Sequence, residues 1–237
     1  MPIFNFGMGN PYRTPVLNAS YPANVTQMET NGSTTFKVVI STAGNPDNYT
    51  YQWYWNGSKA DGATSATYTR SAIPAGSYTV YCTVTNKAGT VTSRTATVTV
   101  NRQYFYNAGN QMSSVTGGWT KNSDDGGKYY LNASDMYLEG VVSVRTANKI
   151  DLSNYKTLYI KITTNGVSDV NRFGAMDSAG KDIEWSTAMA ASVDLGTSTS
   201  EATKALDVSS LTSSYYLIVA TRNAVKTSIK QIWGVLK

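Results

Sequence analysis

Any chemistry in this chain has to be built without histidine, because none of its 237 residues is one, and with the single cysteine Cys82. Histidine is the side chain whose pKa suits proton transfer near neutrality, and it is the commonest transition-metal ligand. Catalytic Ser-His-Asp and Cys-His arrangements are therefore excluded within the chain, and so is a zinc site of clustered Cys and His. The sequence also lacks the glycine-rich phosphate-binding and dinucleotide-binding motifs.

Paired carboxylates are the remaining route to catalysis, and they need two acids held across a cleft. Asp124 and Asp125 stand in "KNSDDGGK", whose Asp-Gly-Gly predicts a turn. Asp182 and Glu184 have the i, i+2 spacing that places both on one face of a strand. Such a pair more often lies on a solvent-exposed face than in an ion site or a catalytic pair. We therefore expect no enzymatic activity, no cofactor and no metal site. The oxygen ligands of a structural calcium cannot be assembled from the sequence.

Aromatic side chains offer a binding chemistry instead, since Trp and Tyr rings present apolar faces that stack on sugar rings and carry a polar tip. Trp119 follows Gly117-Gly118, a pair that could present it on a loop. The candidates for ligand binding lie near expected loops or strand ends and are Trp119, Tyr129, Tyr130 and Trp185, with Tyr137 close by. The alternative is that most of these rings are core or inter-strand residues, as we expect for Trp53 and Trp233.

The composition indicates an all-β protein with more than one domain. Charged residues make up 15% of the chain, below the roughly 25% of an average soluble protein. Thr, Ser, Asn, Gly and 17 Tyr take their place, and such residues favour strands, turns and polar surfaces. The length suits one large domain or two ordinary domains, each with its own hydrophobic core, and we expect two.

The net charge of +5 is spread along the chain rather than clustered. Residues 1–101 carry six Lys and Arg against three acids, and the remainder carries 14 against 12. No basic stripe of the kind that nucleic acid requires is present, so we expect no nucleic-acid partner. No window approaches a membrane-spanning length of apolar residues, and no signal peptide is recognisable, so we expect synthesis in the bacterial cytoplasm and no membrane partner.

The stretch "GSYTVYCTVTNKAGT" positions the lone cysteine. Tyr78, Val80, Cys82 and Val84 fall on one side of a period-two pattern, which predicts a half-buried strand with Cys82 facing inward. With no partner for a nucleophile, a metal site or an internal disulfide, Cys82 is interpreted as a small buried hydrophobe. Val91 to Val100 is expected to form the other arm of a hairpin.

The first domain is predicted over residues 16–101, after an arm at residues 1–15. An edge strand is expected near Val16 to Met28, and further strands follow at short intervals. The segments "YQWYWNG", "GATSATYT" and "GSYTVYCTVTNKAGTVTS" resemble bacterial and phage immunoglobulin-like or PKD-like domains. This resemblance implies a β-sandwich, and Val38 stands where antibody domains carry their second cysteine.

The second domain is predicted over residues 102–237 as another β-sandwich. In "TLYIKIT" apolar Leu158, Ile160 and Ile162 alternate with polar positions, whereas "YYLIVAT" is apolar on both faces, as expected of a strand buried on both sides. The segments "NKIDLSNYKTLYIKI", "KALDVSSLTSSYYLIVAT" and "SIKQIWGVLK" resemble galactose-binding-like jelly rolls. The fold class is thus expected to be an immunoglobulin-like β-sandwich followed by a jelly-roll β-sandwich.

The pair of domains, with its "YNAGNQMSSVTGGW" entry, resembles tail-associated structural proteins of phages and prophages. The resemblance implies a non-enzymatic tail, baseplate or fibre component in the virion, with other virion subunits as partners and a homo-oligomeric state. The apolar residues Ile3, Phe4 and Phe6 are then expected to dock the arm on a neighbouring subunit. A carbohydrate-binding module that recognises bacterial or host glycan through the second domain is the alternative, and a bacterial surface adhesin is a further one.

Overall fold

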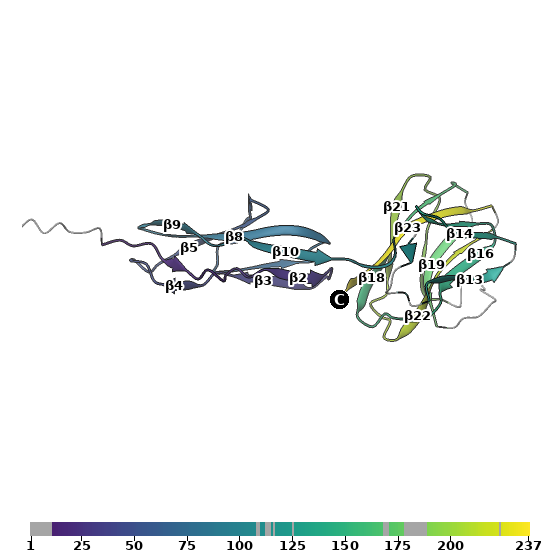
Figure 1. Cartoon of the computed structure of the whole chain (residues 1–237), viewed down its shortest axis with the longest axis horizontal. Coiled ribbons are helices and arrows are strands. Elements are labelled where there is room, and N and C mark those ends of the chain that lie inside the picture. The colour runs from purple at the N-terminus through teal and green to yellow at the C-terminus, as the bar shows by residue number, and fades with distance from the viewer. Residues whose placement is uncertain are drawn as a thin grey trace, which may run out of the picture. The chain divides into compact units, whose positions relative to one another are not determined.

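A computed structural model describes residues 11–107, 110–111, 115, 117–124, 126–167, 171–177, 189–222 and 224–237. Every regular element in these residues is a β-strand, which confirms the expected all-β class (Figure 1). The chain divides into two compact units, residues 1–101 and residues 102–237. Within the described residues no helix is long and apolar enough to cross a membrane.

The first unit is an immunoglobulin-like sandwich built on one larger sheet. This sheet has the strand order β2 (Val25–Met28), β10 (Ala96–Asn101), β8 (Gly76–Asn86), β5 (Thr50–Trp55) and β6 (Ser58–Lys59), and β9 (Gly89–Thr92) also pairs with β8. The other strands form two antiparallel pairs: β3 (Ser33–Lys37) with β7 (Thr67–Ser71), and β1 (Val16–Leu17) with β4 (Ile40–Thr42).

The centre of the first core is the strand pair β5–β8. Trp53 and Cys82 stand opposite each other in the register, and both are fully buried. Burial raises the pKa of the Cys82 thiol to about 11, so the group stays a neutral thiol at physiological pH. The interpretation of Cys82 as a buried hydrophobe is confirmed. Val38 is also buried, so this core closes by apolar packing without an inter-sheet disulfide.

Two stretches that were expected to be single strands are each divided in the structure. The predicted arm Val91 to Val100 consists of β9 and β10, because Ser93 interrupts it: its hydroxyl accepts a hydrogen bond from the Cys82 amide at 3.0 Å and donates one to the Arg94 carbonyl at 2.8 Å. After this break, β10 is free to pair in parallel with β2. Likewise, the expected edge strand from Val16 to Met28 is β1 and β2, which belong to different sheets.

The second unit is a jelly-roll sandwich of two larger sheets. The first, here called the β23 sheet, contains β12 (Asn110–Gln111), β11 (Gln103–Asn107), β23 (Lys226–Leu236), β15 (Met136–Glu139), β14 (Lys128–Leu131), β18 (Tyr155–Thr164) and β21 (Ala202–Asp207). The second, here called the β22 sheet, contains β13 (Trp119–Asp124), β16 (Val142–Thr146), β22 (Ser214–Thr221), β19 (Asn171–Met176) and β20 (Met189–Asp194), and β17 (Ile150–Asp151) pairs with β22.

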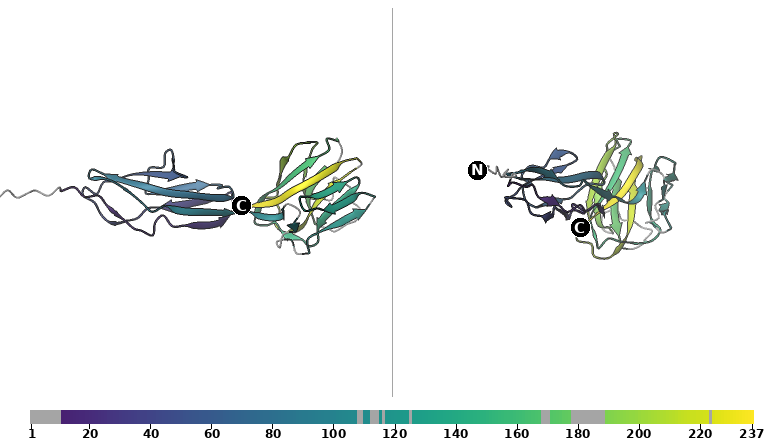
Figure 2. Two further views of the ribbon diagram at one scale, coloured as in Figure 1. Left: turned by 45° about the horizontal axis from the view of Figure 1, so that its top comes forward. Right: turned by 60° about the vertical axis from the view of Figure 1, so that its left-hand side comes forward.

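Strand β23, yellow in Figure 2, organises its sheet, because β18 pairs along one of its edges while β11 and β15 share the other. Inward-facing side chains of the two sheets form one hydrophobic core between them. Leu158, Ile160 and Ile162 of β18 are fully buried, as their alternation predicts. Leu217 and Ile218 of β22 are neighbours in sequence and both fully buried, which confirms a strand covered on both faces.

Candidate functional site

Four side chains form a line across the outer face of the β23 sheet. Tyr130 on β14 is paired with Tyr137 on β15, Tyr137 with Ser228 on β23, and Ser228 with Thr163 on β18. Since neighbouring strands lie about 4.8 Å apart, this tyrosine–hydroxyl row spans about 14 Å. It joins two aromatic rings to two hydroxyl groups, all from separate strands.

The tyrosines of this row point away from the core. Met136 and Leu138, which flank Tyr137 on β15, are fully buried, so the period of two turns Tyr137 outward. The rings of Tyr130 and Tyr137 stack with centroids 6.3 Å apart and planes inclined by 26°. Tyr130 is 51% exposed, an unusual degree of exposure for so large a ring. The pair therefore presents an aromatic surface to solvent.

An open hollow of about 160 Å³ lies beside Tyr137. It is lined by Tyr137, Thr163, Thr164, Asn165, Lys226 and Ser228. Asn165 is held by both ends of its amide: Nδ2 donates to the Ala224 carbonyl at 2.8 Å, and Oδ1 accepts from the Lys226 amide at 3.0 Å. The Thr164 hydroxyl donates to the Ser198 carbonyl at 3.1 Å. The hollow is thus a preformed feature with its polar walls fixed.

Charged groups border the hollow on both sides of the tyrosine–hydroxyl row. On one side Lys128, Glu139 and Lys226 are paired across three strands and form what is called here the charged row. The Tyr137 hydroxyl donates a hydrogen bond of 3.1 Å to Glu139, and this bond, with the nearby lysines, lowers the pKa of Glu139. Glu139 is therefore a carboxylate at physiological pH.

Asp135 lies on the other side of the tyrosine–hydroxyl row. It accepts hydrogen bonds from the Ser228 hydroxyl, from Asn132 Nδ2 at 2.8 Å and from Lys230 Nζ at 3.2 Å. Burial by itself would raise the pKa of Asp135, but these hydrogen bonds outweigh burial and lower it. The Ser228 hydroxyl is oriented by this carboxylate, which leaves its oxygen lone pairs directed elsewhere for a ligand.

Trp119, which the preceding glycine pair could have presented on a loop, is the first residue of β13. Its ring is 4% exposed and belongs to the core of the second unit. The indole Nε1 donates to the Phe105 carbonyl at 3.1 Å. The glycine pair before it closes a turn in which the Gly118 amide bonds the Val115 carbonyl, and this turn leads the chain into the sandwich. Its ring faces are therefore taken by core packing.

The adjacent candidates Tyr129 and Tyr130 face opposite ways, because successive strand residues alternate. Tyr129 packs against the core, its hydroxyl lies 3.4 Å from the Trp119 carbonyl, and burial raises its pKa to about 12. Tyr130 joins the outer face. Trp185 lies outside the described residues, and so do Ile3, Phe4 and Phe6, along with the acids Asp125, Asp182 and Glu184. In the part of the chain that is described, no group of three or more acidic or cysteine side chains could hold a metal ion.

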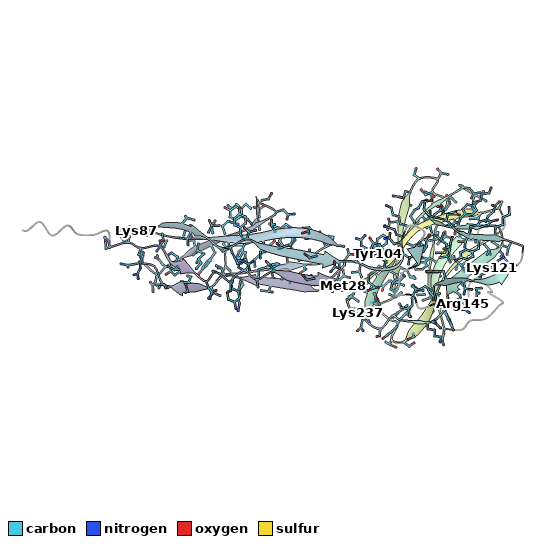
Figure 3. All side chains as sticks on the ribbon, in the orientation of Figure 1. Met28, Lys87, Tyr104, Lys121, Arg145 and Lys237 are labelled. Carbon is cyan, nitrogen blue, oxygen red and sulfur yellow. The ribbon has the colours of Figure 1, made fainter. Side chains whose placement is uncertain are left out.

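Trp233 is buried, as expected, but it lies outside the inter-sheet core cluster and faces the outer side of the β23 sheet. It stands opposite Tyr159 and stacks on that ring at a centroid distance of 5.2 Å, while the Arg102 guanidinium lies 4.6 Å from its ring centre. Lys121 and Arg145, labelled in Figure 3, belong to the β22 sheet and therefore do not contribute to this face.

Sequence reasoning missed the polar half of the site. Thr163, Asn165, Lys226 and Ser228 are common residue types in unremarkable contexts, and they come from segments about 60 residues apart. The alternation of "KTSIKQ" places Lys226 and Ser228 on one face of a strand, and this is the sequence feature that could have indicated part of the site. Their proximity to Tyr137 depends on strand pairing that the sequence does not display.

A second hollow, of about 260 Å³, lies on the first unit around residues 61–69. Its single aromatic residue is Tyr68, whose ring packs on the core at centroid distances of 5.9 Å from Trp53 and 6.2 Å from Phe36. This hollow has hydroxyl groups, but its tyrosine packs against the core, so it lacks the exposed aromatic pair found on the β23 sheet.

No protein-family model matches the chain, and no curated protein does. Solved structures with similar folds include a quinonprotein alcohol dehydrogenase-like protein from Bacteroides thetaiotaomicron (TM-score 0.30, 16% identity, 54% of this chain and 24% of that one). A second is the PKD domain of human KIAA0319, with a TM-score of 0.32 and 19% identity over 40% of this chain and 89% of that one. A third is a carbohydrate-binding module of the β-sandwich superfamily, with a TM-score of 0.38 and 16% identity over 95% of this chain and 99% of that one. The chain thus spans about a quarter of the first of these proteins. At these TM-scores the likenesses carry no conclusion about individual residues or function.

Proposed function

We propose that the second unit binds a glycan on the outer face of the β23 sheet, without catalysis. The observation that carries this proposal is the tyrosine–hydroxyl row beside a hollow whose walls are polar. Tyr130 and Tyr137 offer ring faces to the apolar side of a sugar, and Ser228, Thr163 and Asn165 offer hydrogen-bonding groups to its hydroxyls.

The strand framework suits this role because it holds the contacting groups in place before a ligand arrives. Each comes from a paired strand or from an anchored amide, so binding costs little conformational entropy. The hollow is small and open, which favours weak binding of a chain of sugar rings along the row over deep enclosure of one ring. Weak sites of this kind gain strength when copies are arrayed.

The acids near the hollow support binding over hydrolysis. Asp135 is paired with Lys230, and Glu139 lies 3.4 Å from Lys226, so both carboxylates are held ionised by neighbouring cations. A glycosidase needs one of its two carboxyl groups protonated to act as the acid. The lowered pKa values of Asp135 and Glu139 work against that requirement.

The experiment that tests the proposal is glycan-array screening of the full chain, followed by calorimetric titration of any sugar that binds. Tyr137→Ala is expected to weaken binding about tenfold, because it removes a ring whose stacking on the sugar contributes about 1–1.5 kcal/mol to the binding free energy. Tyr54→Ala is the matched control, since Tyr54 also stacks on another tyrosine, Tyr81 at 4.7 Å, but in the first unit. No binding to any glycan, or equal loss in both variants, would contradict the proposal.

The tail-associated virion role is proposed on the sequence resemblance alone, and a glycan-binding face would serve host attachment in such a particle. Flanking capsid, portal or holin genes would support it. Deleting residues 1–14 is expected to abolish assembly while the two sandwiches stay folded, and unchanged assembly would contradict the role of the arm.

A further inference from the structure

The one charged side chain among the six residues that line the hollow is a lysine. Lys226 stands at the start of β23, and its side chain is 49% exposed. The other lining residues are neutral. A ligand in this hollow therefore meets a positive charge at its wall.

Lys226 shares its carboxylate with a second lysine. Its Nζ lies 3.4 Å from Oε1 of Glu139, and Nζ of Lys128 lies 3.8 Å from Oε2 of the same group. The charged row thus contains two ammonium groups and one carboxylate, a surplus of one positive charge. The Tyr137 hydroxyl also donates to Oε2, which takes up part of the capacity of Glu139 to accept hydrogen bonds.

Among the described residues, the neighbouring acids do not neutralise this surplus. Asp135 is paired with Lys230 at 3.2 Å, and Lys161 of the neighbouring strand β18 is paired with Glu201 at 2.6 Å. Each of these pairs is balanced within itself. The surplus positive charge therefore stays in the charged row, and Lys226 is the member of that row that lines the hollow beside Tyr137.

We infer that the hollow binds a sugar that carries a carboxylate, a uronic acid, with its carboxylate on Lys226 and its ring against Tyr137. This inference rests on the proposed glycan-binding function and specifies its ligand. A ligand carboxylate would be the second anion for two lysines that now share one, and hydrogen bonds between ionised groups are stronger than those between neutral ones. Since Lys226 is half exposed, salt should weaken the attraction, with a screening length of about 8 Å at physiological ionic strength.

The test compares pectate, alginate and hyaluronan oligosaccharides with their methyl esters in calorimetric titrations of the full chain. Esterification keeps the sugar and removes the negative charge. At low salt we expect at least one acid to bind up to about fivefold more tightly than its ester, the upper end of the gain from an exposed ion pair. The preference should shrink as salt is added.

Three variants locate the effect. Lys226→Gln is expected to remove the preference for acid over ester, while Lys161→Gln keeps it, because Lys161 is also a partly exposed, ion-paired lysine but lies outside the hollow. Glu139→Gln is expected to strengthen acid binding by releasing both lysines. Thermal unfolding of each variant checks that the sandwich is intact.

The outcomes separate this inference from the proposed function. Esters or neutral glycans that bind as tightly as the acids would overturn the uronic-acid inference and leave glycan binding in place. Oligoglutamate that binds as tightly as the acidic sugars would overturn it too, because charge without a sugar ring would then suffice. Failure of every sugar, acidic or neutral, to bind would overturn the proposed function itself.

Discussion

The hollows of the two units contain similar residue types but differ in what their tyrosines do. Tyr68 of the first unit occupies an inward position of β7 and packs on Trp53 and Phe36. Tyr137 of the second unit occupies an outward position of β15 and stacks on the exposed Tyr130. An aromatic ring beside a hollow is thus a binding surface when strand parity turns it away from the core, and a stability element when parity turns it inward.

The largest effect is expected from an inward ring of the second unit. Trp119→Ala should lower the free energy of unfolding of that unit by about 3–5 kcal/mol, because it leaves a cavity in the core and an unpaired Phe105 carbonyl. Tyr130→Ala, on the outer face, should change it by less than about 0.5 kcal/mol. Calorimetric unfolding measures both. Equal losses would contradict the division into inward and outward aromatic rings.

A smaller effect on stability is expected in the first unit. Tyr68→Ala should destabilise it by about 2–3 kcal/mol, since a partly buried ring with two stacking neighbours is lost. Sugar binding by the second unit should stay unchanged in this variant. Calorimetric titration measures the binding, and thermal unfolding measures the stability. A Tyr68→Ala chain that keeps its stability but loses sugar binding would reverse the roles assigned to the two hollows.

The smallest effect concerns how the free energy of unfolding falls at acidic pH. The folded-state pKa of Asp135 lies below its ordinary value of 3.8, so its stabilising contribution is present above that pH and is lost as the pH falls through the folded-state value. Asp135→Asn should remove this part of the pH dependence, worth less than about 1 kcal/mol for an ion pair near the surface. Urea unfolding from pH 6 down to about pH 2 measures it. An unchanged fall at acidic pH would show that the Asp135 contacts do not hold its pKa down.

Much of the fold was predictable because burial leaves a period-two trace in the sequence. The alternation around Cys82 correctly predicted an inward thiol, and the doubly apolar "YYLIVAT" correctly predicted a strand covered on both faces. The predicted arm from Val91 to Val100 was wrong in its continuity, and a side-chain hydrogen bond marks the break. Ser93 ends β9 by bonding the backbone of β8, and nothing in its residue type distinguishes it from the other hydroxyl residues of that stretch.

The candidate site was predicted in part. Tyr130 and Tyr137 were named from their positions near expected loops or strand ends, and Trp119 was named with them although its ring fills the core. A glycine pair signals a turn, and it does not tell which way the next side chain points. Tyr129 and Tyr130 could not be separated beforehand either, because a strand's parity becomes meaningful only when its core-facing side is known.

The amino-acid sequence by itself determined the all-β class, the absence of histidine chemistry and the burial of the lone cysteine, because these follow from composition and local alternation. Tertiary structure alone decided that Tyr137, Ser228 and Thr163 lie in one line and that two lysines share Glu139. The physical reason is register. Pairing between strands far apart in the chain sets which side chains become neighbours, and that pairing is chosen by the whole core.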